Sequence, residues 1–224
     1  MSSTDCRSLA ERYAQLAVDV TPRPGDRALR ALDLLIASMA FLLTPVAGLI
    51  GLGVLLTSGR PVFYRGERVG RYGHVFTMRK FRTLRPNAEG RLGGTYGADL
   101  TARMPAETTP FSRFLRVSQL DELPQLWNVL RGDMSIVGPR PVRPVFFEQL
   151  VADIPAYWQR LVVRPGLTGF AQTRMGREEA WAEKLSHDLE WIADRSVGLY
   201  LRIVTRTVLR VVGQSFGGAR RRRT

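Results

Sequence analysis

The sequence predicts a mostly helical α+β protein, with one proline-broken apolar helix near its N-terminus and a small β-hairpin behind it. Three observations lead to this fold class. Residues 34–57 contain no charged side chain, residues 61–76 alternate apolar and polar positions between glycines, and several later segments place apolar residues at helical spacing. The 224 residues suffice for one domain of ordinary size together with a membrane element.

The composition is strongly basic, with a formal net charge of +13. Lys80 and Lys184 are the only lysines, so almost all of the positive charge is arginine. This balance favours anionic partners, namely nucleic acid, anionic lipid or phosphorylated substrates. Cys6 is the sole cysteine, which excludes an internal disulfide, and the distant His74 and His187 match no zinc-ligand spacing.

The uncharged stretch at residues 34–57 is close in length to the roughly 20 residues that cross a bilayer. Thr44 and Pro45 lie near its middle and predict a kink there. Arginines flank both ends, and the positive-inside rule favours the cytoplasmic side for each flank. A re-entrant hairpin that enters, bends at Thr44-Pro45 and returns satisfies both flanks. A buried core helix is the alternative.

The segment at residues 61–76 is typical of a short β-hairpin with glycine turns. Residues 78–84 follow as a basic strand that carries Lys80 and Arg82, and this strand is either a phosphate-binding edge or a solvated face. Residues 87–109 are rich in Gly, Ala and Thr, which predicts a long loop. Such a loop is either a functional lid or disordered.

The rest of the chain is organised around residues 118–141, which read S-Q-L-D-E-L-P-Q-L-W-N-V-L-R-G-D-M-S-I-V-G-P-R-P. Proline is tolerated in a first helical turn, so we expect a helix that begins near Asp121 and contains Pro124. Gly132 is its expected end. Its predicted apolar face consists of Leu123, Leu126, Trp127 and Leu130.

Asp121 and Glu122 are adjacent carboxylates at this helix start. Because a helix N-terminus favours anions, the arrangement suits carboxylates that meet a metal and a phosphate. The alternative is purely structural, since Ser118-x-x-Asp121 is also a capping-box pattern. A stiff Gly-Pro-Arg-Pro loop follows and presents Arg140, and a later turn presents Arg164 beside another proline.

Three further helices are predicted at residues 145–157, 181–192 and 199–212. The last one opposes an apolar face to Arg202, Arg206 and Arg210, which is typical either of an interfacial helix on anionic lipid or of packing on the core. The chain therefore divides into an N-terminal arm at 1–27, a re-entrant membrane helix at 28–58, a main domain at 59–212 and a basic tail at 213–224; the resemblance described next implies that the main domain is a catalytic domain at the cytosolic face.

From about residue 30 to residue 212, the chain resembles the bacterial sugar transferases, also called small monotopic polyprenyl-phosphate phosphoglycosyl transferases. The long run at residues 121–141 is the most specific match, because helix and turn physics do not dictate its order of acids, Trp, Asn, Gly and Pro. The other matching runs are L-D-L-L at 32–35, K-F-R-T-L at 80–84 and V-R-P-G-L-T-G-F-A-Q at 163–172.

The resemblance implies transfer of a sugar-1-phosphate from a UDP-sugar to undecaprenyl phosphate, with release of UMP. This reaction initiates the synthesis of exopolysaccharide or another glycan. It further implies Mg²⁺ as cofactor, the inner membrane at its cytoplasmic face as location, and possible downstream glycosyltransferases as partners. No nucleic-acid partner is expected, because the long uncharged run and the absence of an aromatic-basic platform count against one.

The resemblance also assigns roles by position. Asp121 is the expected nucleophile, which forms an aspartyl-phosphosugar intermediate, and Glu122 completes the dyad and shares the Mg²⁺. The expected phosphate-binding residues are Arg140, Arg164, Lys80 and Arg82. Asp188 matches a further family acid of less certain role. Tyr200 departs from the family pattern, since an acid is frequent there.

Three rival functions remain open at this point. One is a catalytically inactive membrane scaffold for polysaccharide assembly, another is a basic nucleic-acid-binding protein, and a third is a hydrolase of nucleotide sugars. No motif identifies the sugar.

Overall fold

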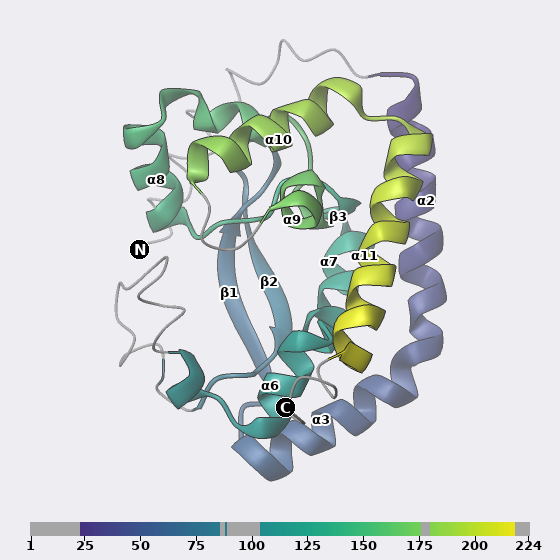
Figure 1. Cartoon of the computed structure of the whole chain (residues 1–224), viewed down its shortest axis with the longest axis vertical. Helices are drawn as coiled ribbons and strands as arrows, with labels where there is room; N and C mark the ends of the chain where they lie inside the picture. Colours follow the sequence, from purple (N-terminus) through teal and green to yellow (C-terminus); the bar gives the residue numbers. More distant parts are fainter. Residues whose placement is uncertain (1–22, 86–87, 89–103, 176–179, 218–224) are drawn as a thin grey trace.

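The computed structural model describes residues 23–85, 88, 104–175 and 180–217 (Figure 1). Most of the predicted N-terminal arm, of the predicted loop at 87–109 and of the basic tail therefore lies outside the described residues. Within them the chain is mostly helical, with two small two-stranded sheets. The predicted mostly helical α+β class and the small β-hairpin are confirmed.

The uncharged stretch forms a helix that is broken where Thr44-Pro45 predicts the kink. Helix α2 (Gly25–Met39) leads through the short 3-10 helix η1 (Ala40–Leu43) into α3 (Thr44–Ser58), and α2 and α3 are bent by 65°. Pro45 lies in the first turn of α3, where its missing N–H is tolerated. Among the described residues no single helix is long and apolar enough to cross a membrane. The bent pair of α2 and α3 meets this requirement, judged by length and composition alone.

Both legs of the broken helix bury one face and expose the other. Asp33 and Ala37 of α2 and Ile50 and Val54 of α3 are buried in the protein. Large apolar side chains cover the opposite faces: Leu34, Leu35, Met39, Leu42, Leu43, Val46, Leu49, Leu52, Leu55 and Leu56. An apolar surface of this extent marks an interaction site rather than an ordinary solvent-facing surface.

Strands β1 (Phe63–Val69) and β2 (Val75–Phe81) form the antiparallel hairpin, and the short turn η2 (Arg71–Gly73) connects them. The predicted separate basic strand at residues 78–84 is wrong, because its first four residues are the end of β2. The alternating burial of β2 continues across residues 76–78, so one strand accounts for both predicted segments.

The predicted acid-proline helix consists of two parts. A 3-10 helix, η4 (Leu120–Gln125), contains Pro124, and an α-helix, α7 (Leu126–Arg131), begins only after it. The predicted apolar face is confirmed for Leu123, Leu126 and Leu130, which pack against the apolar core, but not for Trp127. Trp127 is 47% exposed, whereas Asn128 and Val129 of the same helix are buried. Gly132 ends α7 as predicted, with a φ of 91°.

A small sheet joins the segment before the Gly-Pro-Arg-Pro loop to the V-R-P-G-L-T-G run. Strands β3 (Ser135–Val137) and β4 (Gly166–Thr168) are parallel. The Gly166 N–H donates to the carbonyl oxygen of Pro139 at 2.9 Å. A Cβ atom on Gly166 would lie 2.1 Å from the backbone nitrogen of Gly138, so only glycine permits this approach.

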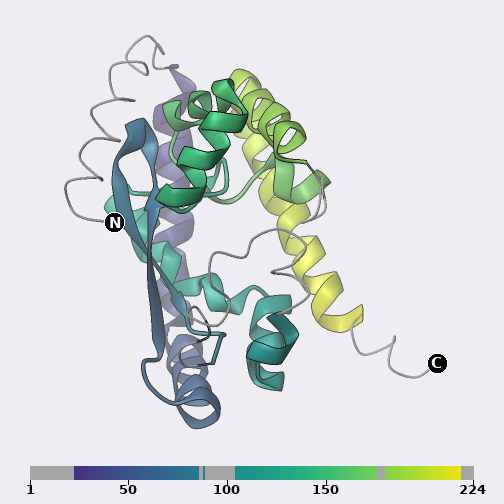
Figure 2. The ribbon, with the colours of Figure 1, turned by 90° about the vertical axis from the view of Figure 1, so that its left-hand side faces the viewer.

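The C-terminal half is mostly helical, and its last helix packs against this small sheet (Figures 1 and 2). Its elements are α6 (Pro110–Val117) before the dyad and, after the dyad, α8 (Pro144–Asp153), η5 (Pro155–Val162), α9 (Phe170–Arg174), α10 (Trp181–Asp194) and α11 (Val197–Gly217). The single helix predicted at residues 145–157 is wrong, since α8 ends before Pro155. A proline disfavours helical conformation in the residue that precedes it.

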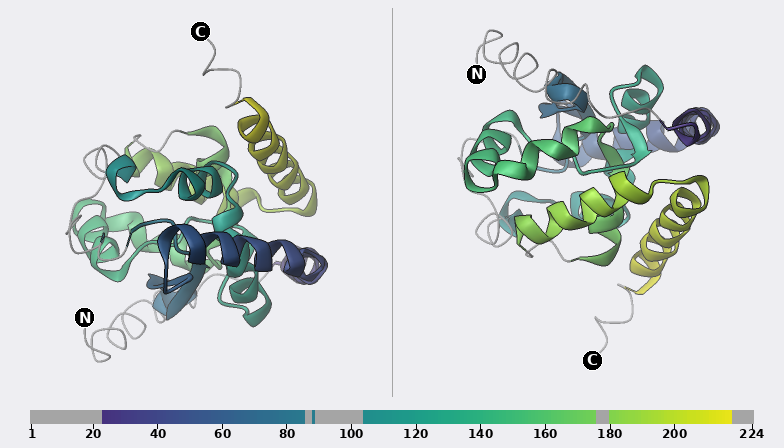
Figure 3. Two further views of the ribbon diagram at one scale, coloured as in Figure 1. Left: turned by 90° about the horizontal axis from the view of Figure 1, so that it is seen from below. Right: turned by 90° about the horizontal axis from the view of Figure 1, so that it is seen from above.

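Asp33 anchors the broken helix in the main core. Its carboxylate accepts hydrogen bonds from the Ser135 hydroxyl, the Ile136 N–H and the Tyr200 hydroxyl, at 2.9, 2.9 and 3.0 Å. Arg30 lies 3.8 Å from it, one helical turn away. These bonds fasten α2 to β3 and to α11, which contacts α2 and leads away from it toward the C-terminus (Figure 3). They also explain Tyr200, because an acid there would repel Asp33 instead of donating to it.

Two glycines of α3 provide a matched test of how this helix packs against α6. A Cβ atom on Gly53 would lie 2.5 Å from the Phe111 ring, whereas nothing lies within 4 Å of a Cβ atom on Gly48. We expect Gly53→Ala to lower the free energy of unfolding by about 1–3 kcal/mol through overpacking. Gly48→Ala should be neutral, or stabilising by up to about 1 kcal/mol, because alanine favours a helix.

Thermal unfolding of the two variants in detergent measures this difference. Equal melting temperatures for Gly53→Ala and Gly48→Ala would show that α3 does not pack on Phe111 as described.

Candidate active site

The acidic pair, Asp121 and Glu122, lies in η4, which directly follows a residue with a left-handed backbone conformation. Gln119 has a φ of 55° and separates η4 from the end of α6. The Ser118 hydroxyl donates to the carbonyl oxygens of Phe114 and Leu115, at 2.9 and 3.2 Å, and makes no cap to the following helix. The capping-box alternative is therefore wrong. Asp121 is only 6% exposed.

Helix α3, the second leg of the broken helix, supports the acidic pair through a shared apolar cluster. Helix η4 lies against β2, and α3 packs against α6. One apolar cluster joins these elements: Ile50, Val54, Phe81 and Leu115, with Leu120 and Leu123 packed against it. The apolar helix that carries the sequence's strongest membrane signal thus also holds the dyad in place.

The surroundings of Asp121 raise the pKa of its carboxyl group. Burial is the main cause, the neighbouring charge of Glu122 adds to it, and the pKa rises to about 6 although Lys80, Arg116 and Arg140 oppose the shift. Burial also lowers the pKa of Lys80 to about 8, against the acidic charges of Asp121 and Glu122. Strongly shifted acidic and basic groups that act on each other's pKa in this way are typical of catalytic sites.

Arg140 completes the group from the Gly-Pro-Arg-Pro loop. Its Nη2 donates to Oε1 of Glu122 at 3.1 Å, and its side chain is 56% exposed while that of Glu122 is 16% exposed. In the part of the chain that the structure describes, no hydrogen bond or ion pair engages the Asp121 carboxylate. The arrangement therefore leaves Asp121 available to a ligand while Arg140 holds its neighbour.

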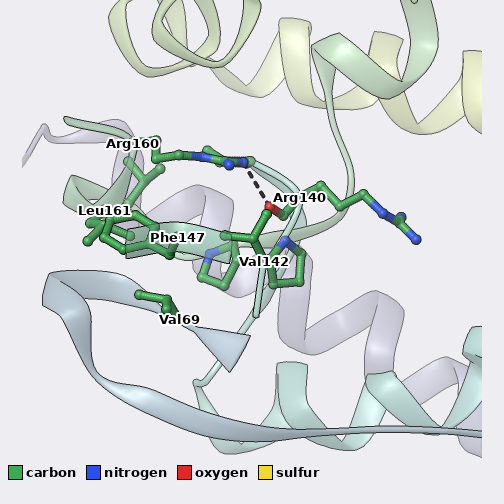
Figure 4. Close-up of a pocket in the computed structure, with 11 residues that line it drawn as sticks. Val69, Arg140, Val142, Phe147, Arg160 and Leu161 are labelled. Atoms are coloured by element: carbon green, nitrogen blue, oxygen red, sulfur yellow. Dashed lines mark hydrogen bonds between the residues drawn. The ribbon is translucent and has the colours of Figure 1, made fainter. Parts of the chain in front are cut away.

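A buried ion pair between Arg160 and Asp188 holds the loop that carries Arg140. Nη2 of Arg160 lies 2.8 Å from Oδ2 of Asp188 and also donates to the carbonyl oxygen of Arg140 at 2.8 Å. Figure 4 shows this bond and shows the Arg140 side chain extending away from Arg160. Val69, Val142 and other apolar residues line the small pocket beside them. Asp188 thus helps to position Arg140 through Arg160. No motif in the sequence pointed to Arg160.

Two predicted phosphate-binding residues lie elsewhere. Arg82 is 8% exposed, and its guanidinium donates to the carbonyl oxygens of Ser58, Gly59 and Arg60 at the end of α3. Neither Arg82 nor Arg164 is among the charges that shift the pKa of Asp121. The sequence placed Arg82 in the same short motif as Lys80, but strand β2 ends between them.

Arg164 is held by the end of α7, because its Nε donates to the carbonyl oxygen of Gly132 at 2.8 Å. It lines a separate pocket with Arg30 and Arg71. Of the predicted basic residues, the structure therefore brings Lys80 and Arg140 to the dyad, and it adds Arg116 from α6. Arg116 stands outside the motifs that the sequence singled out, so nothing in the sequence marked it.

The raised pKa of Asp121 predicts a gain of stability when its charge is removed. A folded-state pKa of about 6, above the ordinary 3.8, means that the folded chain binds more protons between these values. Stability is therefore lost as the pH rises through this range. We expect Asp121→Asn to be more stable than the unaltered chain at pH 7, by about 2–3 kcal/mol at most, and equally stable near pH 4.

Thermal unfolding at both pH values, with a chelator present, measures this effect. Asp153→Asn is the control, because Asp153 is exposed on α8. A stability gain for Asp121→Asn that does not depend on pH would contradict the electrostatic explanation.

The site combines a buried carboxylate, Asp121, and its half-buried neighbour Glu122 with a lysine and an arginine, next to a broken apolar helix. This combination fits the class of sites at which carboxylates and cations act together on a phosphate group. Residues 26–214 match the family described as bacterial sugar transferase, and the chain belongs to that family.

The chain is also similar to curated proteins. The chain is 38% identical over 193 residues to a UDP-glucose:undecaprenyl-phosphate glucose-1-phosphate transferase of Xanthomonas campestris pv. campestris, with 81% of this chain and 38% of that protein covered. It is 37% identical over 203 residues to a protein of the same description from Caulobacter vibrioides, with 84% and 74% covered.

The name of a third relative refers to a different sugar. It is the UDP-N-acetylgalactosamine-undecaprenyl-phosphate N-acetylgalactosaminephosphotransferase of Aeromonas hydrophila, 34% identical over 192 residues, with 84% of this chain and 44% of that protein covered. The chain spans less than half the length of the Xanthomonas and Aeromonas relatives and about three quarters of the Caulobacter one.

Proposed function

We propose that this chain transfers a sugar-1-phosphate from a UDP-sugar to undecaprenyl phosphate and releases UMP. The reaction would initiate the synthesis of exopolysaccharide or another glycan. The observation that carries the proposal is the buried Asp121 carboxylate, which feels the charge of Lys80 and lies beside a Glu122–Arg140 pair. Family membership and the names of the relatives support a UDP-sugar donor and an undecaprenyl phosphate acceptor.

In the proposed mechanism Asp121 is the nucleophile. Its carboxylate oxygen bonds to the β-phosphorus of the donor, the bond from that phosphorus to the bridging oxygen breaks, and UMP leaves. An oxygen of undecaprenyl phosphate then attacks the same phosphorus and frees Asp121. With a pKa of about 6, Asp121 is mostly ionised at neutral pH and is poorly solvated, which favours attack. Lys80 and Arg140 would neutralise phosphate oxygens.

Mg²⁺ is part of the proposal, with Asp121 and Glu122 as its ligands. Among the described residues no group of three or more His, Cys, Asp or Glu side chains could hold a metal. Two carboxylates nevertheless fit Mg²⁺, which in phosphate-transfer sites typically uses one or two carboxylates together with substrate phosphates and water. The ion would supply further neutralisation of the donor phosphates.

The broken helix is proposed to insert into the inner membrane from the cytoplasmic face and to return to it. The exposed apolar faces of α2 and α3 support this, as do the arginines that flank both ends. Val208, Leu209 and Val212 of α11 expose a further apolar strip. This placement would bring the dyad, which α3 supports, close to a lipid-borne acceptor.

UMP release tests the proposed activity. Purified membranes that contain the chain would receive Mg²⁺ and a panel of UDP-sugars, with and without undecaprenyl phosphate. We expect release with a particular sugar that depends on the lipid acceptor. Release of sugar phosphate without acceptor would instead identify a hydrolase, and no release with any UDP-sugar would favour an inactive scaffold.

A further inference from the structure

A second pocket lies where the N-terminal end of α2 meets α10 and the hairpin turn. The turn between β1 and β2, the stretch at residues 162–164 and the end of α10 contribute to its wall. Part of its lining is apolar and includes Leu29, Val137 and Trp191. Its charged lining consists of Arg30, Arg71, Arg164, Arg195, Asp26 and Asp33. Arginine therefore outnumbers acid two to one, and we call this site the arginine pocket.

Both acids of the arginine pocket are already engaged within the protein. Asp26 accepts a two-point pair from Arg195, with Nε at 2.7 Å and Nη2 at 2.9 Å. Asp33 accepts the three core hydrogen bonds described above and pairs with Arg30. These two acids thus account for Arg195 and Arg30, and the remaining arginines of the pocket are Arg71 and Arg164.

Arg71 and Arg164 are tethered by only one edge of their guanidinium groups. Nε of Arg71 donates to the carbonyl oxygen of Val162 at 3.1 Å, and Nε of Arg164 donates to that of Gly132 at 2.8 Å. Arg71 also lies over the ring of Tyr72. Within the described part of the chain, the terminal nitrogens of Arg71 and Arg164 have no recorded hydrogen-bond acceptor.

These two guanidiniums also repel each other. Burial is the main cause that lowers the pKa of Arg71, and the charges of Arg164 and Arg195 lower it further. Burial likewise lowers the pKa of Arg164, with Arg30 adding to the shift. Positive charge is thus concentrated in a half-buried pocket without enough acid to balance it. A bound anion would relieve the repulsion and would accept the free N–H groups.

We propose that the arginine pocket binds a phosphate group, carried either by an anionic lipid headgroup or by free phosphate. Fixed guanidinium forks suit the several oxygens of a phosphate better than a single carboxylate oxygen. The pocket is distinct from the dyad site. The charges that act on Asp121 are those of Glu122, Lys80, Arg116 and Arg140, and none of these residues lines the arginine pocket.

The lipid source has support from the position of the pocket along α2. Arg30 lines the pocket, and Leu34 and Leu35 are exposed one helical turn later. A headgroup in the pocket would place its acyl chains beside this apolar face. The lipid source therefore rests on the proposed membrane insertion, whereas binding of free phosphate does not.

The test uses the full chain purified in detergent and a double variant, Arg71→Gln with Arg164→Gln. Thermal unfolding is followed against inorganic phosphate, with chloride keeping the ionic strength constant, and yields an apparent Kd. We expect this Kd to rise at least about tenfold in the double variant. Arg65→Gln with Arg131→Gln is the control, because it removes the same charge from outside the pocket and should leave the Kd unchanged.

A second arm identifies the source of the phosphate. The same proteins are placed in nanodiscs of phosphatidylcholine, with or without phosphatidylglycerol. A stabilisation by phosphatidylglycerol that only the double variant loses assigns a lipid headgroup, and its absence beside a phosphate response assigns free phosphate. The single variant Arg71→Gln serves if the double variant fails to fold. Equal responses of the double variant and the control in both arms would overturn the proposal, whatever the outcome of the UMP assay.

Discussion

Asp121→Asn is expected to lower the rate of UMP release on the order of a thousandfold or more. Asparagine keeps the size of the side chain but provides no anionic oxygen to attack the β-phosphorus. Because Asp121 is buried and makes no hydrogen bond or ion pair with the other described residues, the change should leave the surrounding packing intact. The stability gain expected for this variant at neutral pH shows independently whether it is folded.

A labelled donor tests the covalent step itself. With the sugar phosphate radiolabelled and no lipid acceptor present, the unaltered chain should retain label on the protein after denaturation. Asp121→Asn should retain none, and Asp153→Asn, with its exposed carboxylate changed, should behave like the unaltered chain. Equal labelling of Asp121→Asn and the unaltered chain would remove Asp121 from the nucleophile role.

Asp188→Asn is expected to lower the free energy of unfolding by about 3–5 kcal/mol. Asp188 and Arg160 form a 2.8 Å pair in which each side chain is 5% exposed. Burial raises the pKa of the Asp188 carboxyl group, so loss of its charge by itself favours the folded chain. The larger, opposing cost arises because the Arg160 guanidinium is left buried without a counter-charge. Chemical denaturation measures the loss.

An exposed pair provides the matched control. Arg174 and Glu190 are 2.7 Å apart, but their side chains are 36% and 38% exposed. Glu190→Gln should therefore cost less than about 1 kcal/mol, because solvent screens the pair. If Asp188→Asn costs no more than Glu190→Gln, the Arg160–Asp188 pair does not stabilise the fold in the way the structure indicates.

A double variant of the Arg160–Asp188 pair tests its contribution to stability separately from its positioning of Arg140. Arg160→Met combined with Asp188→Leu replaces both charges with apolar side chains and should recover most of the lost stability. It does not restore the hydrogen bond to the Arg140 carbonyl oxygen, so we expect kcat to stay about tenfold or more below that of the unaltered chain. Full recovery of kcat would show that Arg160 has no positioning role.

The sequence alone determined those features that depend on neighbouring residues. The run without charge at residues 34–57 and the proline within it predicted a broken helix, because both the lack of charge and the missing N–H act locally. The same holds for the hairpin and for the helix at residues 181–192. The order of residues 121–141 located the dyad and Arg140, which the structure places together.

The tertiary structure alone decided which distant segments meet. Arg82 and Arg164 lie in recognisable motifs, yet they bind the backbone at the ends of α3 and α7 instead of joining the dyad. The pairing of β3 with β4 and the Arg160–Asp188 pair also had no local signal. Periodicity along the chain reports which face of an element is buried, but not which partner buries it. That choice depends on how whole elements pack, and here it created the arginine pocket.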